Sequence, residues 1–163
     1  KADSDIIYKI NSDKISVFTD ATLFSLTNPT ICATDETDFS SFEIDYKGQT
    51  SNISLEREED EYKSTENKTY YQYHPVLNGA QMDAQEYESF LSSIQNTALE
   101  QATNLTAKGE PVLKITIKHF DTDRIDTISF YETDGNALVV TGDIVRGTIE
   151  TSSFETLIES MPV

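Results

Sequence analysis

Two stretches of the chain carry apolar residues at the spacing of a helix that buries one face. The first set ends well before the C-terminus, and the second lies close to it. The i, i+3, i+4, i+7 spacing puts each set on one side of an α-helix, so the chain must supply an apolar surface to cover both. The two sets are Tyr87, Phe90, Leu91 and Ile94, and Phe154, Leu157, Ile158 and Met161.

Each apolar set follows a polar residue of the kind that begins helices. Asp83 is followed three residues later by Glu86, and Ser152 is followed three residues later by Glu155. Such pairs are typical of a capping box, in which the first side chain accepts a hydrogen bond from a free backbone N–H. We therefore predict helices that begin after Asp83 and after Ser152.

Alternation of apolar and polar residues predicts a hairpin before the first helix. Phe42, Ile44 and Tyr46 face one way, "KGQT" supplies a glycine turn, and Ile53 and Leu55 continue on the return strand. The charged string "REEDEYKSTENK" that follows is expected to be a solvated connection.

A second hairpin precedes the second helix. Leu113, Ile115 and Ile117 alternate with polar residues, "DTDRID" turns the chain, and Ile128 and Phe130 lie on the return strand. "TDGN" is another turn, and "ALVVTGDIVRGTIE" predicts two further short strands separated by "GD".

The stretch "TYYQYHPVLNGAQM" predicts one more strand ahead of the first helix. Tyr71 and Tyr73 share one face of it, whereas Tyr70 and His74 share the other. Pro75 is expected to end the pairing, and "NGAQM" to form a loop.

A strand runs into an amphipathic helix three times, beginning with "IIYKINSDKISVF", where Ser12 is the expected N-cap. We predict an α+β fold of antiparallel β-sheets with helices packed on one face, built by internal duplication of a hairpin–strand–helix unit. The expected units are residues 1–40, a partial strand–helix repeat, and residues 41–100 and 101–163, each a complete unit.

The charge excludes several classes of partner. The chain of 163 residues has 12 basic and 29 acidic side chains and a net charge of −17. Such a surface repels phosphate backbones and anionic headgroups, so we expect no nucleic acid and no direct binding to an anionic membrane surface. Abundant Ser, Thr, Asn and Asp with few Lys, and a start without methionine, lead us to expect an exported protein that has lost a leader or belongs to a longer chain.

No motif for catalysis, cofactor binding or metal binding is recognisable. GxSxG, GxGxxG and P-loop patterns are absent. His74 lies beside a proline, and His119 has the parity of a core-facing residue near the edge of a sheet. We interpret Cys32 as a half-buried structural thiol. We therefore predict no catalytic residues, no metal ligands and no cofactor.

If a binding surface exists, we expect it on the tyrosine-rich strand and the loop that follows it. The candidate residues are Tyr70, Tyr71, Tyr73 and His74, since loops set on rigid elements often carry recognition. Two alternatives stay open. One is a ligand-binding or hydrolytic site assembled from distant residues. The other is an adhesion module stabilised by calcium bound to "TDETDFSSFE" or "FDTDRID".

The order of elements resembles the DUF4340 family of bacterial envelope-associated proteins. The pieces that carry the resemblance are "IIYKINSDKISVF", "FEIDYKGQTSNISLE", "DAQEYESFLSSI", "NLTAKGEPVLKITI" and the closing strand and helix. Leu105 and Pro111 match part of a Gly-Leu then Pro element common in that family, although the glycine is missing and the spacing is longer.

The resemblance implies an exported or lipid-anchored protein without an established activity, whose genes often lie beside those of ABC-transporter components. Together with the residues, it leads us to expect a non-catalytic interaction module. Its partner would be another envelope protein, and its role accessory to a transporter.

Overall fold

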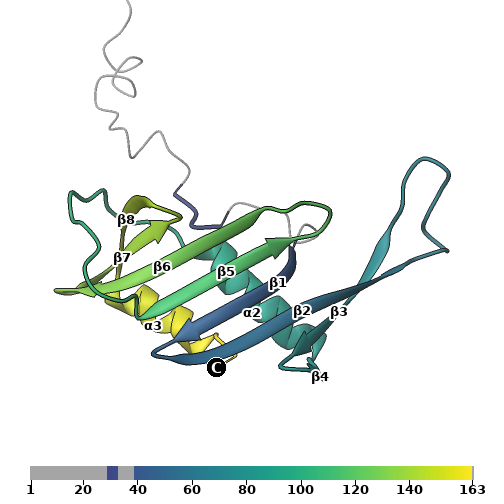
Figure 1. The fold of residues 1–163 in the computed structure, drawn as a ribbon, viewed down its shortest axis with the longest axis horizontal. Coiled ribbons are helices and arrows are strands. Elements are labelled where there is room, and N and C mark those ends of the chain that lie inside the picture. The colour runs from purple at the N-terminus through teal and green to yellow at the C-terminus, as the bar shows by residue number, and fades with distance from the viewer. Residues whose placement is uncertain (1–28, 33–38, 163) are drawn as a thin grey trace, which may run out of the picture.

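One eight-stranded antiparallel sheet and two helices make up the part of the chain that the structure describes (Figure 1). The structure is a computed structural model that describes residues 29–32 and 39–162. The strand and helix predicted in "IIYKINSDKISVF" lie outside these residues. In chain order the elements are β1 (Phe39–Tyr46), β2 (Gln49–Glu59), β3 (Tyr71–Leu77), β4 (Ala80–Gln81), α2 (Ala84–Asn96), β5 (Leu113–His119), β6 (Ile125–Thr133), β7 (Asn136–Thr141), β8 (Ile144–Glu150) and α3 (Thr151–Glu159).

The strands follow the order β4-β3-β2-β1-β5-β6-β7-β8. Two four-stranded meanders therefore run outward from a central pair, β1 and β5, in which Ile44 lies opposite Ile115. Each meander is followed by one helix, and both helices lie on the same face of the sheet (Figure 1). The predicted α+β class with antiparallel strands is confirmed.

The core lies between the central strands and the two helices. Phe42 lies opposite Ile117 in the sheet, and its ring meets the ring of Phe90 edge-on at 5.2 Å. The predicted apolar stripe of α2 is buried throughout. In α3, Phe154 and Leu157 are buried, Met161 is buried just beyond the helix, and Ile158 packs against the core while partly exposed. Both predicted stripes are thus confirmed.

A second buried layer lies on the opposite face of β6–β8. Ala137 and Val139 join the core under the helices, whereas their neighbours Leu138 and Val140 point the other way and are also buried. The crossover after α2 pairs with the edge of β8 at Thr148 through the backbones of Glu100 and Gln101. Its residues 104–106 then line a surface pocket together with Leu138, on this side of the sheet. The apolar run "ALVV" is therefore buried on both faces.

The region after the tyrosine-rich strand differs from the predicted loop. Asn78 and Gly79, at φ 50° and 85°, form a two-residue hairpin turn that leads into β4. Two positive φ values are what such a turn requires, and Asn-Gly supplies them at low cost. The prediction that "NGAQM" forms a loop is therefore wrong at Ala80 and Gln81, which are paired.

The prediction that Pro75 ends the pairing is also wrong. Pro75 lies opposite Leu55, and β3 continues to Leu77. The backbone N–H of Asn78 donates to the carbonyl of Asn52, and the N–H of Asp60 donates to the carbonyl of Tyr70. Because hydrogen-bonded and non-hydrogen-bonded pairs alternate along an antiparallel ladder, Pro75 and Leu55 form a non-hydrogen-bonded pair. The ring nitrogen replaces an N–H that would point away from β2, so β2 loses no bond.

The two helices begin differently. Asp83 caps α2 as predicted, and its carboxylate accepts hydrogen bonds from the N–H groups of Gln85 and Glu86 at 2.9 and 3.3 Å. The capping box predicted at Ser152 is wrong. The backbone is already helical at Thr151, and the N-cap, Glu150, makes no side-chain capping bond. β8 ends where α3 begins, so the strand sets the start of this helix.

The two N-caps form a matched pair for a stability test. We predict that Asp83→Ala lowers the free energy of unfolding by about 0.5–2 kcal/mol, because two N–H groups lose their acceptor. Glu150→Ala changes it by less than about 0.5 kcal/mol, since no capping bond is lost. Chemical denaturation of both variants measures the difference; equal losses would contradict the assigned caps.

Candidate functional site

The outer part of the β2–β3 ribbon extends beyond the rest of the sheet, and we call residues 56–74 the arm (Figure 1). The pairing of β1 with β2 ends at Ser41 and Ser54, so in the arm β2 has β3 as its strand neighbour. β2 continues to Glu59. The charged string predicted as a connection therefore begins as a strand, and the loop starts at Asp60.

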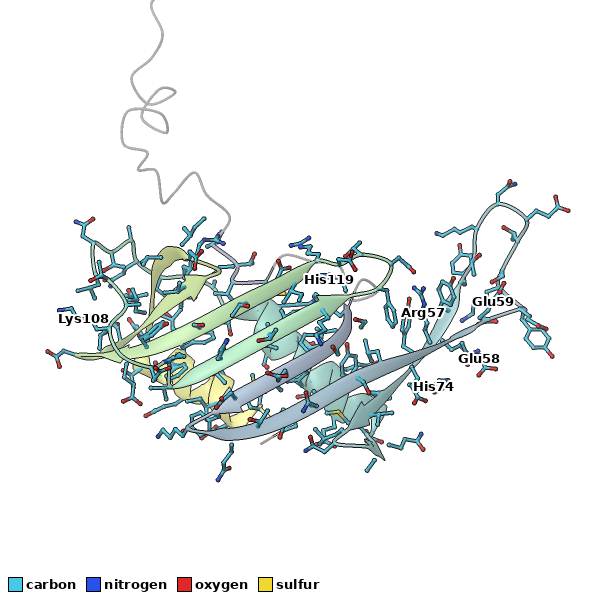
Figure 2. The ribbon with its side chains drawn as sticks, viewed as in Figure 1. Arg57, Glu58, Glu59, His74, Lys108 and His119 are labelled. Atoms are coloured by element: carbon cyan, nitrogen blue, oxygen red, sulfur yellow. The ribbon has the colours of Figure 1, made fainter. Side chains whose placement is uncertain are left out.

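Arg57 connects the base of the arm, next to the body of the sheet, to the β5–β6 turn. Its guanidinium donates two hydrogen bonds to the carboxylate of Asp121, at 2.8 and 2.6 Å. The same group lies over two rings, 4.6 Å from the ring centre of Tyr71 and 4.3 Å from that of Phe120. Figure 2 shows Arg57 where the arm leaves the body, with Glu58 and Glu59 farther out. We call Arg57, Tyr71, Phe120 and Asp121 the clamp.

The charges of the clamp stabilise each other. Hydrogen bonds from Arg57, followed by its positive charge, hold the pKa of Asp121 below its usual value. The hydrogen bond to Asp121 in turn raises the pKa of Arg57. Asp121 has a φ of 59°, a left-handed conformation that aspartate tolerates better than most residues. The turn thus holds a strained backbone at the point where the carboxylate meets the arm.

A row of aromatic side chains continues from the clamp toward α2. The ring of Tyr73 lies 6.4 Å from Tyr71 and 6.1 Å from Phe120. Beyond Tyr73 is a pocket of about 240 Å³ between the ribbon and α2. We call it the α2–β3 pocket; its lining residues are Leu55, Tyr73, Pro75, Ala84, Tyr87, Glu88 and Leu91.

Asp60 organises the tip of the arm. Its side chain, only 4% exposed, accepts hydrogen bonds from the backbone N–H groups of Tyr62 and Lys63 and from the amide of Gln72. Burial alone would raise its pKa, but the hydrogen bonds from Gln72 and Lys63 outweigh burial and lower it. Tyr62, next to this turn, is fully exposed.

The predicted binding residues fall into two groups. Tyr71 and Tyr73 lie together in the aromatic row, on the face of the arm that carries Arg57. Tyr70 contacts Lys68 instead, whose ammonium lies 4.6 Å from the ring centre. His74 is exposed and alternates with Tyr73, so it faces the other way (Figure 2). The structure therefore brings two of the four together.

The sequence did not single out Arg57, Phe120 or Asp121 as parts of a site. Arg57 and Asp121 are 64 residues apart, and only the fold brings them together. One signal was present: Arg57 follows Ile53 and Leu55 at period two, which puts a charge on the apolar face of its strand.

The remaining chemical groups form no second site in the described ranges. His119 is buried on the core side as predicted, with its Nε2 2.9 Å from Asp126, which also pairs with Arg124. Its predicted position near a sheet edge is wrong, since β5 lies between β1 and β6. Among the described residues, no group of three or more His, Cys, Asp or Glu is arranged to hold a metal. Cys32 is buried.

Comparison with known proteins adds no relative. No family model, no curated protein and no solved structure matches the chain. The resemblance to DUF4340 therefore stays a prediction. Over residues 29–32 and 39–162, no helix is long and apolar enough to cross a membrane.

The clamp predicts a local effect of Arg57→Leu. Loss of two cation–π contacts, each worth about 0.5–1 kcal/mol at exposed sites, should speed amide hydrogen exchange in the arm by about fivefold to thirtyfold. Arg146→Leu is the control, since Arg146 lies on β8, at the opposite side of the sheet from the arm. Unchanged exchange in the arm of Arg57→Leu would contradict the clamp.

Acidification should loosen the arm at both ends. Asp60 and Asp121 have lowered pKa values in the folded chain. Their stabilisation is therefore complete above the unfolded value of about 3.9 and is lost as the pH falls through the lower folded values. Tyrosine NMR shifts between pH 6 and pH 2 report the change. Asp121→Asn should remove the response at Tyr71; an identical response would refute the assignment.

Proposed function

We propose that the chain is a non-catalytic interaction module of an exported cell-envelope protein and binds a protein partner through the arm. The observation that carries this proposal is the arm itself, a two-stranded ribbon held out from the sheet that displays tyrosines to solvent. Tyr62 is fully exposed, and Tyr70 and Tyr71 are 39% and 38% exposed.

The chemistry of the arm suits recognition. Tyrosine offers a large, stiff contact surface and a hydroxyl group, and it is enriched among the residues that dominate binding energies at protein interfaces. The clamp and the turn around Asp60 fix the ribbon before it meets a partner, which reduces the entropy lost on binding. A loop without such contacts would lose more conformational entropy when it binds.

The proposed location and partner rest on the composition and on the resemblance to DUF4340. The net charge of −17 and the low Lys content are compatible with an exported protein whose partner is another envelope protein. A role accessory to a transporter is part of the same proposal. Neither nucleic acid nor an anionic membrane surface is the proposed partner, because both would be repelled.

Internal duplication of the predicted hairpin–strand–helix unit is the proposed origin of the module, and each of the two described halves has four strands and one helix. Ser93 and Ser160 each lie one residue before the last member of their apolar stripe, Ile94 and Met161. Their hydroxyl oxygens are 2.6 Å apart, and each hydroxyl has the carbonyl three residues earlier within hydrogen-bond distance. One hydroxyl therefore donates to the other, which donates to its own carbonyl. Equivalent residues in mutual contact are expected at the axis of a twofold repeat, which supports the proposal.

Site-specific photocrosslinking in cells tests the proposed function. A benzophenone amino acid at position 62 should crosslink the protein to one defined envelope protein. The control carries it at Ile144, which is 67% exposed on β8, at the other side of the sheet. Crosslinks to the same proteins from both positions, or none from position 62, would refute an arm-mediated interaction.

A further inference from the structure

We infer that the α2–β3 pocket receives a lysine side chain of the protein that binds the arm. This inference rests on the proposed function and adds the chemistry of the contact. The pocket begins where the aromatic row of the arm ends, because Tyr73 belongs to both. A partner that lies along the arm therefore reaches the pocket without leaving the aromatic surface.

The size of the pocket suits one side chain. Its volume of about 240 Å³ is below the roughly 300–1,000 Å³ typical of small-molecule sites. Leu55, Pro75 and Leu91 are buried and provide apolar walls, while Ala84 and Glu88 are exposed at the opening. Lysine matches this gradient, since its four-carbon stem favours apolar contact and its ammonium favours a charged, wet rim.

The described residues that line the pocket include groups that attract a positive charge. Tyr73 and Tyr87 supply aromatic rings, and Glu88 supplies a carboxylate, but no Lys or Arg among the described residues lines the pocket. No ion pair within the described part of the chain uses Glu88. Two rings and a carboxylate are together a favourable setting for an ammonium group.

The clamp shows the same combination of groups with its cation in place. There, Tyr71, Phe120 and Asp121 surround the guanidinium of Arg57. The pocket lies beside the clamp along the same aromatic row, because Tyr73 lines the pocket and also lies next to Tyr71 and Phe120 of the clamp. The arm thus presents one cation site filled from within the chain and one that a partner fills.

α3 provides a matched control for Glu88. Glu88 directly follows Tyr87, the first member of its apolar stripe, and Glu155 directly follows Phe154 in the same way. Both glutamates are the fifth residue of their helix and are exposed. Glu155 is not among the residues that line the α2–β3 pocket.

NMR titration of the complete chain tests the inference without any partner. The probes are Nα-acetyl-lysine methylamide and Nα-acetyl-norleucine methylamide, which has a similar apolar stem without the ammonium. We expect saturable shifts at Leu55, Tyr73 and Tyr87 and about threefold to tenfold tighter binding of the lysine derivative. Glu88→Gln should abolish this preference, whereas Glu155→Gln should leave it unchanged.

Two results would overturn the inference. Equal affinity for both probes would mean an apolar pocket without selectivity for a cation. An equal loss in Glu88→Gln and Glu155→Gln would mean general attraction to an acidic protein, which 150 mM salt should already screen beyond about 8 Å. Because the titration uses no partner, its failure leaves the crosslinking from position 62 intact, and failed crosslinking does not alter the titration.

Discussion

The pairing of β1 with β5 is the contact on which the rest of the sheet depends. It joins two antiparallel meanders into one sheet, with Ile44 opposite Ile115 at the centre and both fully buried. The helix of each half then packs on a shared core, which includes Phe90 from α2 and Leu157 from α3. Without this pair, each half would expose an unpaired strand edge and much of its apolar surface.

The same arrangement explains why the arm needs a clamp. On one side, β2 pairs with β1 only as far as Ser54. Beyond Ser54 the ribbon consists of two strands, β2 and β3. Isolated two-stranded ribbons are marginally stable in water. The central pair places the β5–β6 turn beside the arm, and Phe120 and Asp121 of that turn hold Arg57. The pairing of β1 with β5 therefore fixes the turn that holds the arm, and so also the position of the proposed binding surface.

Local patterns predicted most of the elements, whereas the assembled site required the fold. The alternation around Ile44 and Ile115 and the cap at Asp83 depend on neighbours in sequence, so they were readable in advance. The predicted end of pairing at Pro75 and the predicted capping box at Ser152 were wrong because strand pairing determines the local structure at both places. Tyr71 was a candidate from the start, but Phe120 and Asp121, which hold its neighbour Arg57, come from a turn beyond α2, and no sequence spacing encodes that contact.

The central claim is that the arm is a fixed extension of the sheet that presents tyrosines to a partner. Pulsed electron spin resonance measures most directly how firmly the arm is fixed to the sheet. The spin labels are placed at positions 62 and 43, through cysteines introduced in a Cys32→Ser background. Position 43 lies on β1 and is exposed, so its label reports the body of the sheet. The account predicts one narrow distance distribution that broadens in Arg57→Leu. A broad distribution in the unsubstituted arm would contradict it.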